Sequence, residues 1–589
     1  MNDIDYLILG GGSAGCVLAA RLSEDAGKTV VLVEAGRDLQ QDALPDNIRA
    51  RYPGLAYLDQ DNVWPGLMAT VSGAATAGAA RTPRFYEQAR VLGGGSAINA
   101  MVANRGAMDD YDEWGRSGAA GWNGEVALKY FRKLERDCDF TDEYHGKSGP
   151  IPVRRHTERT TSPFVKAVCR TLQANGYRRK NDQNGKWEDG VFPAAIATTD
   201  DGHRIPASIA YLTPEVRRRP NLRILTDTEV HELVFEGTRV IGAEVAPSRR
   251  PEVPAEGGHP QVVLAHETIV CLGGIHSAAL LMRSGIGDAR ALQDIGITVR
   301  RDLPGVGKNL MEHPLIAVST YLPKEARLRD LQEHHDQALL RYTSTSIGDA
   351  PAGDMHVAII ARTGWHAIGE RIGTMLVWVN KSYSRGSVAL RSADPRDEPV
   401  VSFNLLSDQR DLDRLKEGFC LAARTLLDRR MDGVRGTVFP TSYSERVRKV
   451  SRPGTWNAWQ MRLFGKALDH AGVFRDFVVH RVITGGLRIN RLLANDRALT
   501  DFVANSVTGV WHASGTCRMG SQSDPMAVTD GAGRVFGMQG LRVCDSSIMP
   551  TIPRANTNMP TLMIAERIAD LIKEEATSTR DDALVVHDS

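Results

Sequence analysis

The first 36 residues contain two short apolar runs, separated by a glycine-rich turn and a segment of small residues. Residues 6–9 and 29–33 are the two runs, and the second is rich in β-branched residues and ends at Glu34. Runs of this kind are typical of strands buried on both faces of a parallel sheet. Residues 16–23 have the helical spacing of small and apolar side chains. The pattern predicts a strand, a tight turn, a helix and a second strand.

Two later segments have a regular pattern as well. Residues 262–272 form another apolar run, closed by two glycines, which predicts a further strand. Residues 556–575 begin with a turn, and the apolar spacing from residue 562 to residue 575 predicts a helix near the end of the chain.

Other segments are rich in polar residues or turn formers and are expected to be loops. Residues 72–80 consist mostly of small residues, and residues 249–260 are rich in Pro, Gly and charge. Residues 322–353 are polar and include two adjacent histidines. Adjacent residues do not share a helix face, so a solvated loop is favoured there over a metal site. The polar residues 577–589 are expected to be a frayed tail.

Composition restricts the number of domains and the kinds of partner, but it does not indicate an activity. The chain has 589 residues, which predicts two or more domains. The 72 Lys and Arg residues nearly balance the 71 Asp and Glu residues, so net charge gives no reason to propose nucleic acid or an acidic membrane as a partner. No apolar run reaches the length of a membrane-spanning helix.

The N-terminus and the cysteines predict a cytoplasmic protein. Residues 1–6 carry two acids and lead directly into the first strand, unlike a secretory signal. The seven cysteines are scattered, and no two have CxxC spacing. Such a pattern favours reduced thiols over a disulfide framework or a zinc site.

The turn after the first strand has the glycine spacing of a dinucleotide-binding site. Gly10, Gly12 and Gly15 follow the strand and open the helix, and the acidic Glu34 ends the second strand. Gly10 permits the tight turn, Gly12 allows the backbone to approach a pyrophosphate, and Gly15 permits close packing of helix and strand. The positive end of the helix then faces the pyrophosphate. Glu34 can accept hydrogen bonds from a ribose, and its charge disfavours NADP.

A second glycine-rich segment favours FAD over NAD. Residues 90–99 contain three successive glycines, followed by Ser96 and Asn99. Backbone N–H groups of such a segment can bind an extended acceptor such as a flavin ring or its phosphates. A cofactor that spans two distant glycine-rich segments is long, as FAD is.

Taken together, these motifs resemble the glucose-methanol-choline (GMC) family of FAD oxidoreductases. The resemblance rests on residues 10–34, on ARVLGGGSAINAMVANRGAMDDYD at 89–112, and on VWHASGTCRMG at 510–520 with the following LRVCDSSIMP and NTNMPT segments. A weaker match at 273–287 has Gly274 where the family usually has Ala, and Ala278 where it has Pro. Within the family the chain is most similar to bacterial 5-hydroxymethylfurfural oxidases, which oxidise furanic and benzylic primary alcohols.

The resemblance implies an α/β fold: a doubly wound Rossmann-type FAD-binding domain with an inserted α+β substrate domain built on an antiparallel sheet. The FAD-binding domain is expected to comprise three separated stretches. The expected boundaries are residues 1–155, 218–315 and 501–576 for the FAD-binding domain, 156–217 and 316–500 for the substrate domain, and 577–589 for a flexible tail.

Alcohol oxidation by hydride transfer requires a base for the hydroxyl proton and a hydride acceptor at flavin N5. A neutral imidazole suits the first task, because an unperturbed His titrates close to working pH. His512 matches the family's active-site base, and Asn556 occupies the partner position, where it can donate to the substrate oxygen. Asn556 could equally cap the C-terminal helix.

The resemblance also indicates the remaining site residues. The residues expected to bind the cofactor are Gly10, Gly12, Ser13, Ala14, Gly15, Glu34, Ala35, Trp64, Arg90, Leu92, Gly93, Gly94, Ser96, Asn99, Ala100, Met101, Val102, Val230, Gly273, Trp511, Asp545, Asn556, Thr557 and Met559. The expected substrate pocket comprises Met101, Trp378, Val510 and Trp511. A flat apolar pocket suits an aromatic ring, although core packing explains Trp511 almost as well. Some family members attach FAD through a His that Ile98 replaces here, so non-covalent FAD is expected.

Four functions remain open at this point. The first is oxidation of an aryl or furanic alcohol to the aldehyde, and through the hydrate to the acid, with O2 giving H2O2. The second is a dehydrogenase that uses a quinone or other acceptor, including one acting on a larger aryl diol. A lyase or photodecarboxylase on the same fold, and a flavin-binding scaffold without activity, are disfavoured by the presence of His512 and Asn556. Oligomeric state and natural substrate are not predicted.

Overall fold

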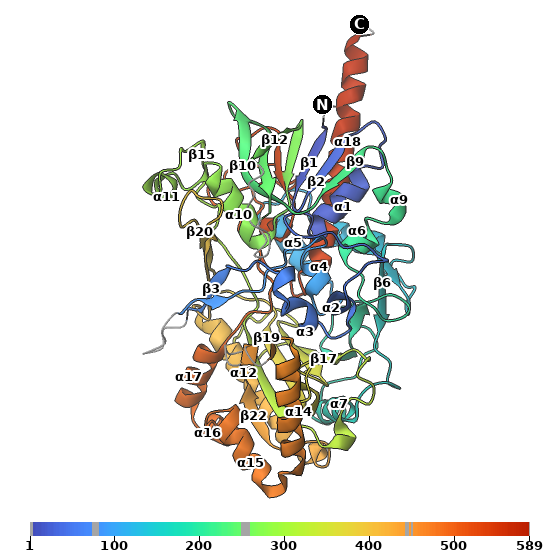
Figure 1. The fold of residues 1–589 in the computed structure, drawn as a ribbon, viewed down its shortest axis with the longest axis vertical. Coiled ribbons are helices and arrows are strands. Elements are labelled where there is room, and N and C mark those ends of the chain that lie inside the picture. The colour runs from blue at the N-terminus through green and yellow to red at the C-terminus, as the bar shows by residue number, and fades with distance from the viewer. Residues whose placement is uncertain (1–3, 74–81, 249–258, 442–446, 449–450, 588–589) are drawn as a thin grey trace.

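The computed structural model describes residues 4–73, 82–248, 259–441, 447–448 and 451–587. Two sheets organise it, one above the other in Figure 1, where the N-terminal strands and the C-terminal helix occupy the upper half. None of the described helices is long and apolar enough to cross a membrane.

The upper sheet is parallel and five-stranded, and it draws strands from three distant stretches of the chain. Its order is β23–β13–β1–β2–β9. The strands are β1 (Tyr6–Leu9), β2 (Val30–Val33), β9 (Leu222–Leu225), β13 (Glu267–Val270) and β23 (Leu541–Val543). All residues of β1 and β2 are buried, as their continuous apolar runs predict. This sheet is the doubly wound Rossmann-type sheet expected from the sequence; the domain boundaries themselves stay a prediction.

Helices pack against this sheet from both ends of the chain. The helix α1 (Ser13–Leu22) follows β1 directly and packs against α18 (Asn558–His587). Arg21 of α1 binds the buried Glu566 of α18 through Nη2 and Oε1, which lie 2.8 Å apart. The C-terminal segment is thereby held beside the turn that follows β1. The helix α10 (Gly273–Arg283) also begins near this turn, just after Cys271, which lies against Gly10.

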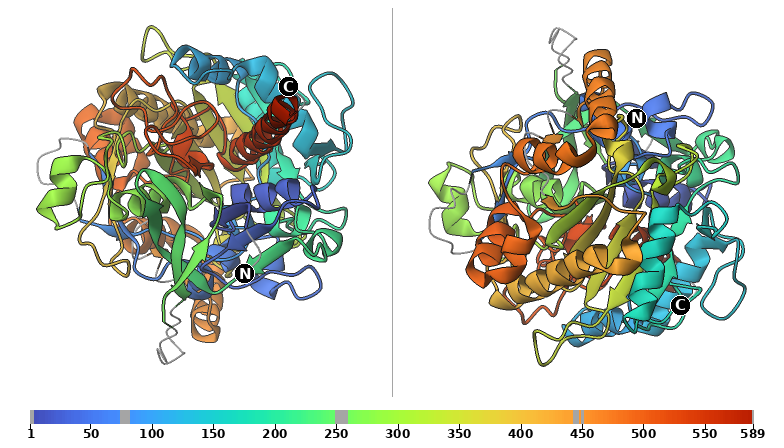
Figure 2. Two further views of the ribbon diagram at one scale, coloured as in Figure 1. Left: turned by 90° about the horizontal axis from the view of Figure 1, so that it is seen from above. Right: turned by 90° about the horizontal axis from the view of Figure 1, so that it is seen from below.

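The lower sheet is antiparallel and six-stranded. Its order is β22–β16–β19–β18–β17–β7. The strands are β7 (Gly190–Pro193), β16 (Leu315–Tyr321), β17 (Asp336–Tyr342), β18 (Met355–Ile360), β19 (Ile372–Val379) and β22 (Val438–Thr441). The helices α7 (Pro163–Ala174) and α12 (Gln409–Leu427) cover its outer face, as the right-hand view of Figure 2 shows. The inner face is directed toward the upper half.

Smaller sheets and further helices complete the fold. One three-stranded sheet is made of β10 (Thr228–Glu236), β11 (Arg239–Pro247) and β12 (Gln261–Leu264), and a four-stranded sheet is made of β3 (Met68–Ser72), β4 (Arg84–Phe85), β20 (Ser387–Ala389) and β21 (Val400–Leu405). Further helices include α4 (Gly95–Ile98), α5 (Met108–Arg116), α6 (Gly124–Leu134), α14 (Thr455–His470), α16 (Ile489–Ala494) and α17 (Asp496–Ser506).

One predicted loop is a strand, and that prediction was wrong. Residues 336–342 of the polar 322–353 segment form β17, in which every residue is buried between β7 and β18. His334 and His335 precede it and are buried rather than solvated. The strand is buried because β7 and β18 flank it, and Arg341 donates from it to the carbonyls of Glu188 and Gln183, at 2.8 and 3.0 Å.

Three other expectations need correction or fall outside the described residues. The apolar run 262–272 is divided between β12 and β13 instead of forming one strand. The last helix is longer than predicted and includes residues 577–587, which were expected to be frayed; no Pro or Gly interrupts it after Pro560. Most of the predicted loops at 72–80 and 249–260 lies outside the described residues.

Candidate active site

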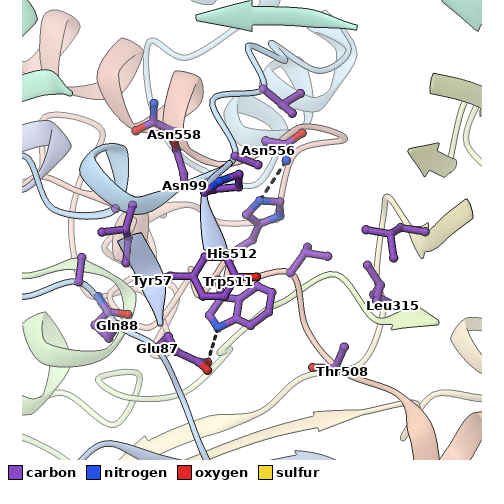
Figure 3. A pocket seen from close by; sticks show the side chains of 18 of the residues that line it. Tyr57, Glu87, Gln88, Asn99, Leu315, Thr508, Trp511, His512, Asn556 and Asn558 are labelled. Carbon is purple, nitrogen blue, oxygen red and sulfur yellow. Dashed lines mark hydrogen bonds between the residues drawn. The ribbon is translucent and has the colours of Figure 1, made fainter. Parts of the chain in front are cut away.

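One large cavity lies between the two sheets. Its volume is about 800 Å³, within the range for cofactor and ligand sites. The glycine-rich turn after β1, the segment before α18 and the inner face of the six-stranded sheet all contribute to its lining. Figure 3 shows the part of this cavity where His512 and Asn556 face each other.

The glycines of the first turn have the backbone geometry that their spacing predicts. Gly10 has a φ of 105°, and a Cβ there would lie 2.5 Å from the Cys271 carbonyl oxygen. A Cβ on Gly15 would lie 1.9 Å from the Gly10 oxygen, so only glycine permits this packing of α1 on β1. A Cβ on Gly12 would meet one atom, 3.8 Å away, and Gly12 lines the cavity. The backbone of Gly12 is therefore open to a bound group.

Glu34 lies at the end of β2 with its carboxylate already oriented. The backbone N–H groups of Gly11 and Gly36 donate to its two oxygens, at 2.8 and 2.7 Å. The side chain is buried and lines the cavity. Burial raises the pKa of this carboxyl, and the two backbone hydrogen bonds oppose the rise. An oriented acid at this position can accept hydrogen bonds from ribose hydroxyls.

The second glycine-rich segment packs directly on the first. The N–H of Gly93 donates to the Gly11 carbonyl at 2.7 Å, and a Cβ on Gly94 would lie 2.7 Å from the Gly12 Cα. Gly94 has a φ of 53° and lines the cavity. A Cβ on Gly95, at the start of α4, would meet nothing within 4 Å. The two segments thus form one continuous wall with room beside it.

Most of the residues expected to bind the cofactor line the cavity. They are Gly10, Gly12, Ser13, Ala14, Glu34, Ala35, Trp64, Gly94, Asn99, Ala100, Met101, Val102, Gly273, Trp511, Asp545, Asn556 and Thr557. The others lie outside its lining: Gly15, Arg90, Leu92, Gly93, Ser96, Val230 and Met559. Several of these support the wall from behind; for example, Ser96 donates to the Gly93 carbonyl at 2.5 Å.

His512 is buried beside a second histidine. Its Nδ1 lies 2.8 Å from Nδ1 of His313, and the two rings meet edge to face. Burial, and to a lesser degree the His313 ring, lowers the pKa of His512 well below its ordinary value. Burial also lowers the pKa of His313 to about 3. Both rings are therefore neutral near pH 7, and one donates to the other.

The surroundings of the pair indicate which ring donates. Nε2 of His313 is buried and has no regular hydrogen-bond partner among the described residues; the Pro553 backbone raises the pKa of the ring, and we assign the His313 proton to Nε2 on that basis. A proton on that side leaves His313 Nδ1 as an acceptor for the Nδ1–H of His512. The lone pair of His512 is then on Nε2, which faces Asn556.

Asn556 is oriented so that its amide nitrogen faces the imidazole. Its Nδ2 lies 3.3 Å from Nε2 of His512, and its Oδ1 is 3.5 Å from the amide nitrogen of Asn104. The position of Asn104 favours the amide orientation in which Asn556 donates to His512. Asn556 lies two residues before α18, beside the start of that helix. A substrate hydroxyl that contacts both Nε2 of His512 and Nδ2 of Asn556 would meet a base and a hydrogen-bond donor.

Glu312 fixes the segment that carries His512. Its carboxyl oxygens accept from the backbone N–H of His512 at 2.7 Å and of His313 at 2.8 Å, and from the hydroxyl of Tyr86 at 3.2 Å. The side chain is almost fully buried, and burial raises the pKa of Glu312 to about 7. The same segment includes Trp511, whose φ of 61° is unusual for a non-glycine residue. Glu312 thus holds a strained turn in place.

Apolar and aromatic side chains surround the pair. The ring of Trp378 on β19 stacks on His356 of β18 with centroids 4.0 Å apart, and its cavity face adjoins Leu315 and Val510. Trp511 stacks on Tyr57 and donates from Nε1 to Glu87 at 3.1 Å. All four residues expected in the substrate pocket, Met101, Trp378, Val510 and Trp511, line the cavity.

Sequence reasoning missed the residues that support His512. His313 and Glu312 are 199 and 200 residues away from it, and a single Glu-His-Pro string carries no spacing that links them to it. Tyr57 lies in a segment without regular pattern, and His356 is one ordinary position of β18. These contacts exist only because the fold brings the start of β16 against residues 508–512, and the sequence does not show that pairing.

Comparisons with known proteins agree with this geometry. Two models of the GMC oxidoreductase family match residues 4–315 and 382–565. The chain is 40% identical to 5-(hydroxymethyl)furfural oxidase of Methylovorus sp. (strain MP688), over 97% of this chain and 99% of that protein. It is 32% identical to the oxygen-dependent choline dehydrogenase of Vibrio vulnificus (strain YJ016), over 96% and 94% respectively.

A solved structure of a related enzyme has a similar fold. Pyridoxine 4-oxidase from Mesorbium loti superposes with a TM-score of 0.77 at 27% identity, and the match covers 97% of this chain and 99% of that one. The two matched ranges include both glycine-rich segments and the segment that carries His512. The chain therefore belongs to the GMC oxidoreductase family, the FAD-dependent oxidoreductases, and acts on alcohols.

Proposed function

We propose that this enzyme oxidises primary aryl or furanic alcohols to aldehydes, and aldehyde hydrates onward to acids, with O2 as the acceptor and H2O2 as the second product. The observation that carries the proposal is the His512–Asn556 pair beside an apolar, aromatic wall. One neutral imidazole and one amide nitrogen lie 3.3 Å apart and line the cavity. A sugar would leave its hydroxyls unpaired against Trp378 and Leu315, whereas an aromatic ring would bury apolar surface there.

The residues of the wall fit FAD as cofactor. Gly12 and the N-terminus of α1 would hold the pyrophosphate, where helix N–H groups and the helix dipole favour a negative charge. Glu34 would bind the ribose through its oriented carboxylate. Asn99, Ala100 and the strained Met101, with a φ of 62°, would lie along the flavin. Bound FAD supplies the acceptor for the hydride that leaves the carbinol carbon.

The protein residues move the proton. Nε2 of His512 accepts the hydroxyl proton of the substrate while Nδ2 of Asn556 donates to the same oxygen. The hydrogen bond between Nδ1 of His512 and His313 keeps the ring of His512 oriented while it takes the proton. Burial of His512 limits the access of water to the developing alkoxide, so the hydrogen bond from Asn556 acts at low local polarity.

FAD is proposed to be held without a covalent bond. Ile98 occupies the position at which some relatives carry the His that links to the cofactor, and it lines the cavity with an apolar side chain that cannot form such a link. The proposed location is the cytoplasm, which agrees with seven free cysteines.

The competing assignment is a dehydrogenase that passes electrons to a quinone or another acceptor. A relative named as an oxygen-dependent choline dehydrogenase and a relative named as an oxidase both match almost the whole chain. His512 and Asn556 act on the alcohol, and this half-reaction is common to both assignments. Oxygen reactivity therefore has to be measured separately.

A panel of alcohols under air tests the proposal. Benzyl, vanillyl and furfuryl alcohols are compared with choline and glucose, and both H2O2 release and dye reduction are recorded. The proposal predicts stoichiometric H2O2 from the aromatic alcohols and little turnover of choline or glucose. Dye reduction without H2O2 would establish the dehydrogenase instead. Turnover of choline or glucose alone would contradict the proposed substrate class.

A further inference from the structure

The cavity continues far beyond His512 along the six-stranded sheet. Side chains that alternate along β16 and β19 face it in cross-strand pairs, so one face of the sheet forms its floor. The pairs are Leu315 with Trp378, Ala317 with Leu376, and Ser319 with Thr374. Four residues of a strand span about 13 Å. The floor is therefore longer than a single aromatic ring with one hydroxymethyl group.

The reacting end of this floor is apolar and lies beside His512. The backbone of Leu315 exchanges hydrogen bonds with Thr508, at 2.7 and 3.1 Å, four residues before His512. Leu315 and Trp378 pack together with Val510. Figure 3 shows Leu315 and Thr508 on the side of the cavity that faces Trp511 and His512. A ring that carries the reacting group would rest at this end.

The opposite end of the floor is polar. The hydroxyls of Ser319 and Thr374 lie 2.7 Å apart, and Thr441 donates to the Ser319 hydroxyl at 2.6 Å. Along the same row of cross-strand pairs, Thr374 faces Ile360, and Ile360 faces Asp336. The row therefore brings Asp336 to the end of the cavity that lies away from His512.

In the described part of the chain, two side chains at this distal polar end each have a buried atom without a hydrogen-bond partner. Asp336 and His335 are 6% and 7% exposed, and both line the cavity. Among the described residues, nothing forms a hydrogen bond with Oδ1 of Asp336 or with Nδ1 of His335. The nearby Arg362 is already bound to the carbonyls of Gly364 and Leu331, each at 2.9 Å. Buried polar atoms without partners are costly unless a ligand completes them.

The two unpartnered groups define the chemistry of that ligand. Burial raises the pKa of Asp336 to about 7, and burial foremost lowers the pKa of His335 well below its ordinary value. A carboxyl and a neutral imidazole pair well with a hydroxyl, which donates and accepts in turn. An alkyl tail would leave both groups without a hydrogen bond. A carboxylate would be unfavourable beside the carboxyl of Asp336, because Arg362 already binds backbone carbonyls.

We propose that the cavity binds an elongated aromatic alcohol: its hydroxymethyl group lies at His512, its rings lie over the apolar floor, and a second hydroxyl contacts Asp336 and His335 at the distal polar end. This inference rests on the proposed oxidation of aromatic alcohols at His512. It adds a binding site for the far end of the substrate and predicts selection for length and for a distal hydroxyl.

Three substrates measured with the FAD-loaded enzyme test the inference. They are benzyl alcohol, biphenylmethanol, and biphenylmethanol with a phenol hydroxyl at the far para position. The wild-type kcat/KM is expected to be at least about tenfold higher for the hydroxylated biphenyl than for the plain one, because an unfilled polar site penalises the analogue that lacks the group. Equal kcat/KM values for the two biphenyls would overturn the inference.

Two variants locate the effect. In Asp336→Leu the advantage of the hydroxylated biphenyl is expected to disappear, while kcat/KM for benzyl alcohol changes less than about twofold. Asp336→Asn keeps the shape and is used if Asp336→Leu fails to bind FAD; it should reduce the advantage severalfold. An advantage that is unchanged in Asp336→Asn would contradict a contact at Asp336. If the wild type oxidises none of the three alcohols, the proposed function fails rather than the distal site.

Discussion

Nδ1 of His313 lies 2.8 Å from Nδ1 of His512, and in the proposed mechanism this contact determines which nitrogen of His512 faces the substrate. Because both rings are neutral when buried, His512 can present a lone pair at Nε2 only if its proton is on Nδ1. His313 accepts that proton in a hydrogen bond. It is therefore a positioning residue for the base, in the way that a carboxylate positions the histidine of a catalytic triad.

Replacing His313 should impair the base without emptying the cofactor site. In His313→Ala we expect kcat to fall by roughly 10- to 100-fold, because His512 loses the partner that fixes its tautomer. His313→Gln keeps a hydrogen-bond acceptor and should recover part of the loss. Since His313 also contributes to the low pKa of His512, the acid limb of the kcat/KM profile should move to higher pH in His313→Ala.

A matched histidine outside the cavity controls for general damage. His156→Gln replaces another partly buried ring whose pKa burial lowers to about 4, and it does not line the cavity. Its kcat and pH profile should match the wild type. An unchanged pH profile in His313→Ala would show that His313 only fills space.

Gly12 and Gly15 should respond differently to the same substitution. A Cβ on Gly12 has room in the protein but projects beside the cavity, so Gly12→Ala should fold and bind FAD at least about tenfold more weakly. A Cβ on Gly15 collides with the Gly10 oxygen, so Gly15→Ala should lower the melting temperature of the apoprotein as well. Fluorescence titration with FAD and thermal melting of both apoproteins distinguish the two effects. Full FAD affinity in Gly12→Ala would contradict a pyrophosphate at this turn.

Glu312 should make stability depend on pH. Its pKa rises from 4.5 to about 7 on folding, so the native state holds the proton more tightly, and this contribution to stability is lost as pH rises through that range. A shift of this size corresponds to roughly 3 kcal/mol in total. Glu312→Gln cannot ionise, so its melting temperature, measured relative to that of the wild type, should rise between pH 5 and pH 8. The exposed Glu143→Gln should show no such gain. A constant difference between Glu312→Gln and the wild type would refute the raised pKa.

Bound FAD should be released by denaturation. Because Ile98 offers no nucleophile to the flavin, precipitation with hot acid or methanol should leave free, fluorescent FAD in the supernatant. Recovery is measured against the flavin absorbance of the native enzyme. Yellow colour that stays with the pellet would mean that another residue forms a covalent link.

The cofactor turn could be predicted from the sequence because its determinants are local. Gly10, Gly12, Gly15 and Glu34 lie within 25 residues, and each has a steric or electrostatic role that follows from spacing alone. His512 and Asn556 were found because they lie in segments that resemble a family. Neither spacing nor burial pattern would have identified them.

The remaining features depend on contacts between distant segments. His313 and Glu312 become part of the site only because β16 meets residues 508–512. β17 has a polar sequence, and its burial comes from β7 and β18 on its two sides. For the same reason His335 and Asp336, which look like a solvated pair in the sequence, line a buried cavity.

In the proposed mechanism, His512 takes the proton that permits hydride transfer. Anaerobic mixing with benzyl alcohol tests it most directly, with flavin absorbance recorded in the wild type, His512→Ala and His512→Asn. The structure predicts rapid bleaching in the wild type, and bleaching at least about 10³-fold slower in both variants, with FAD still bound at wild-type stoichiometry. Bleaching of His512→Ala at the wild-type rate would contradict the assignment of His512 as the base.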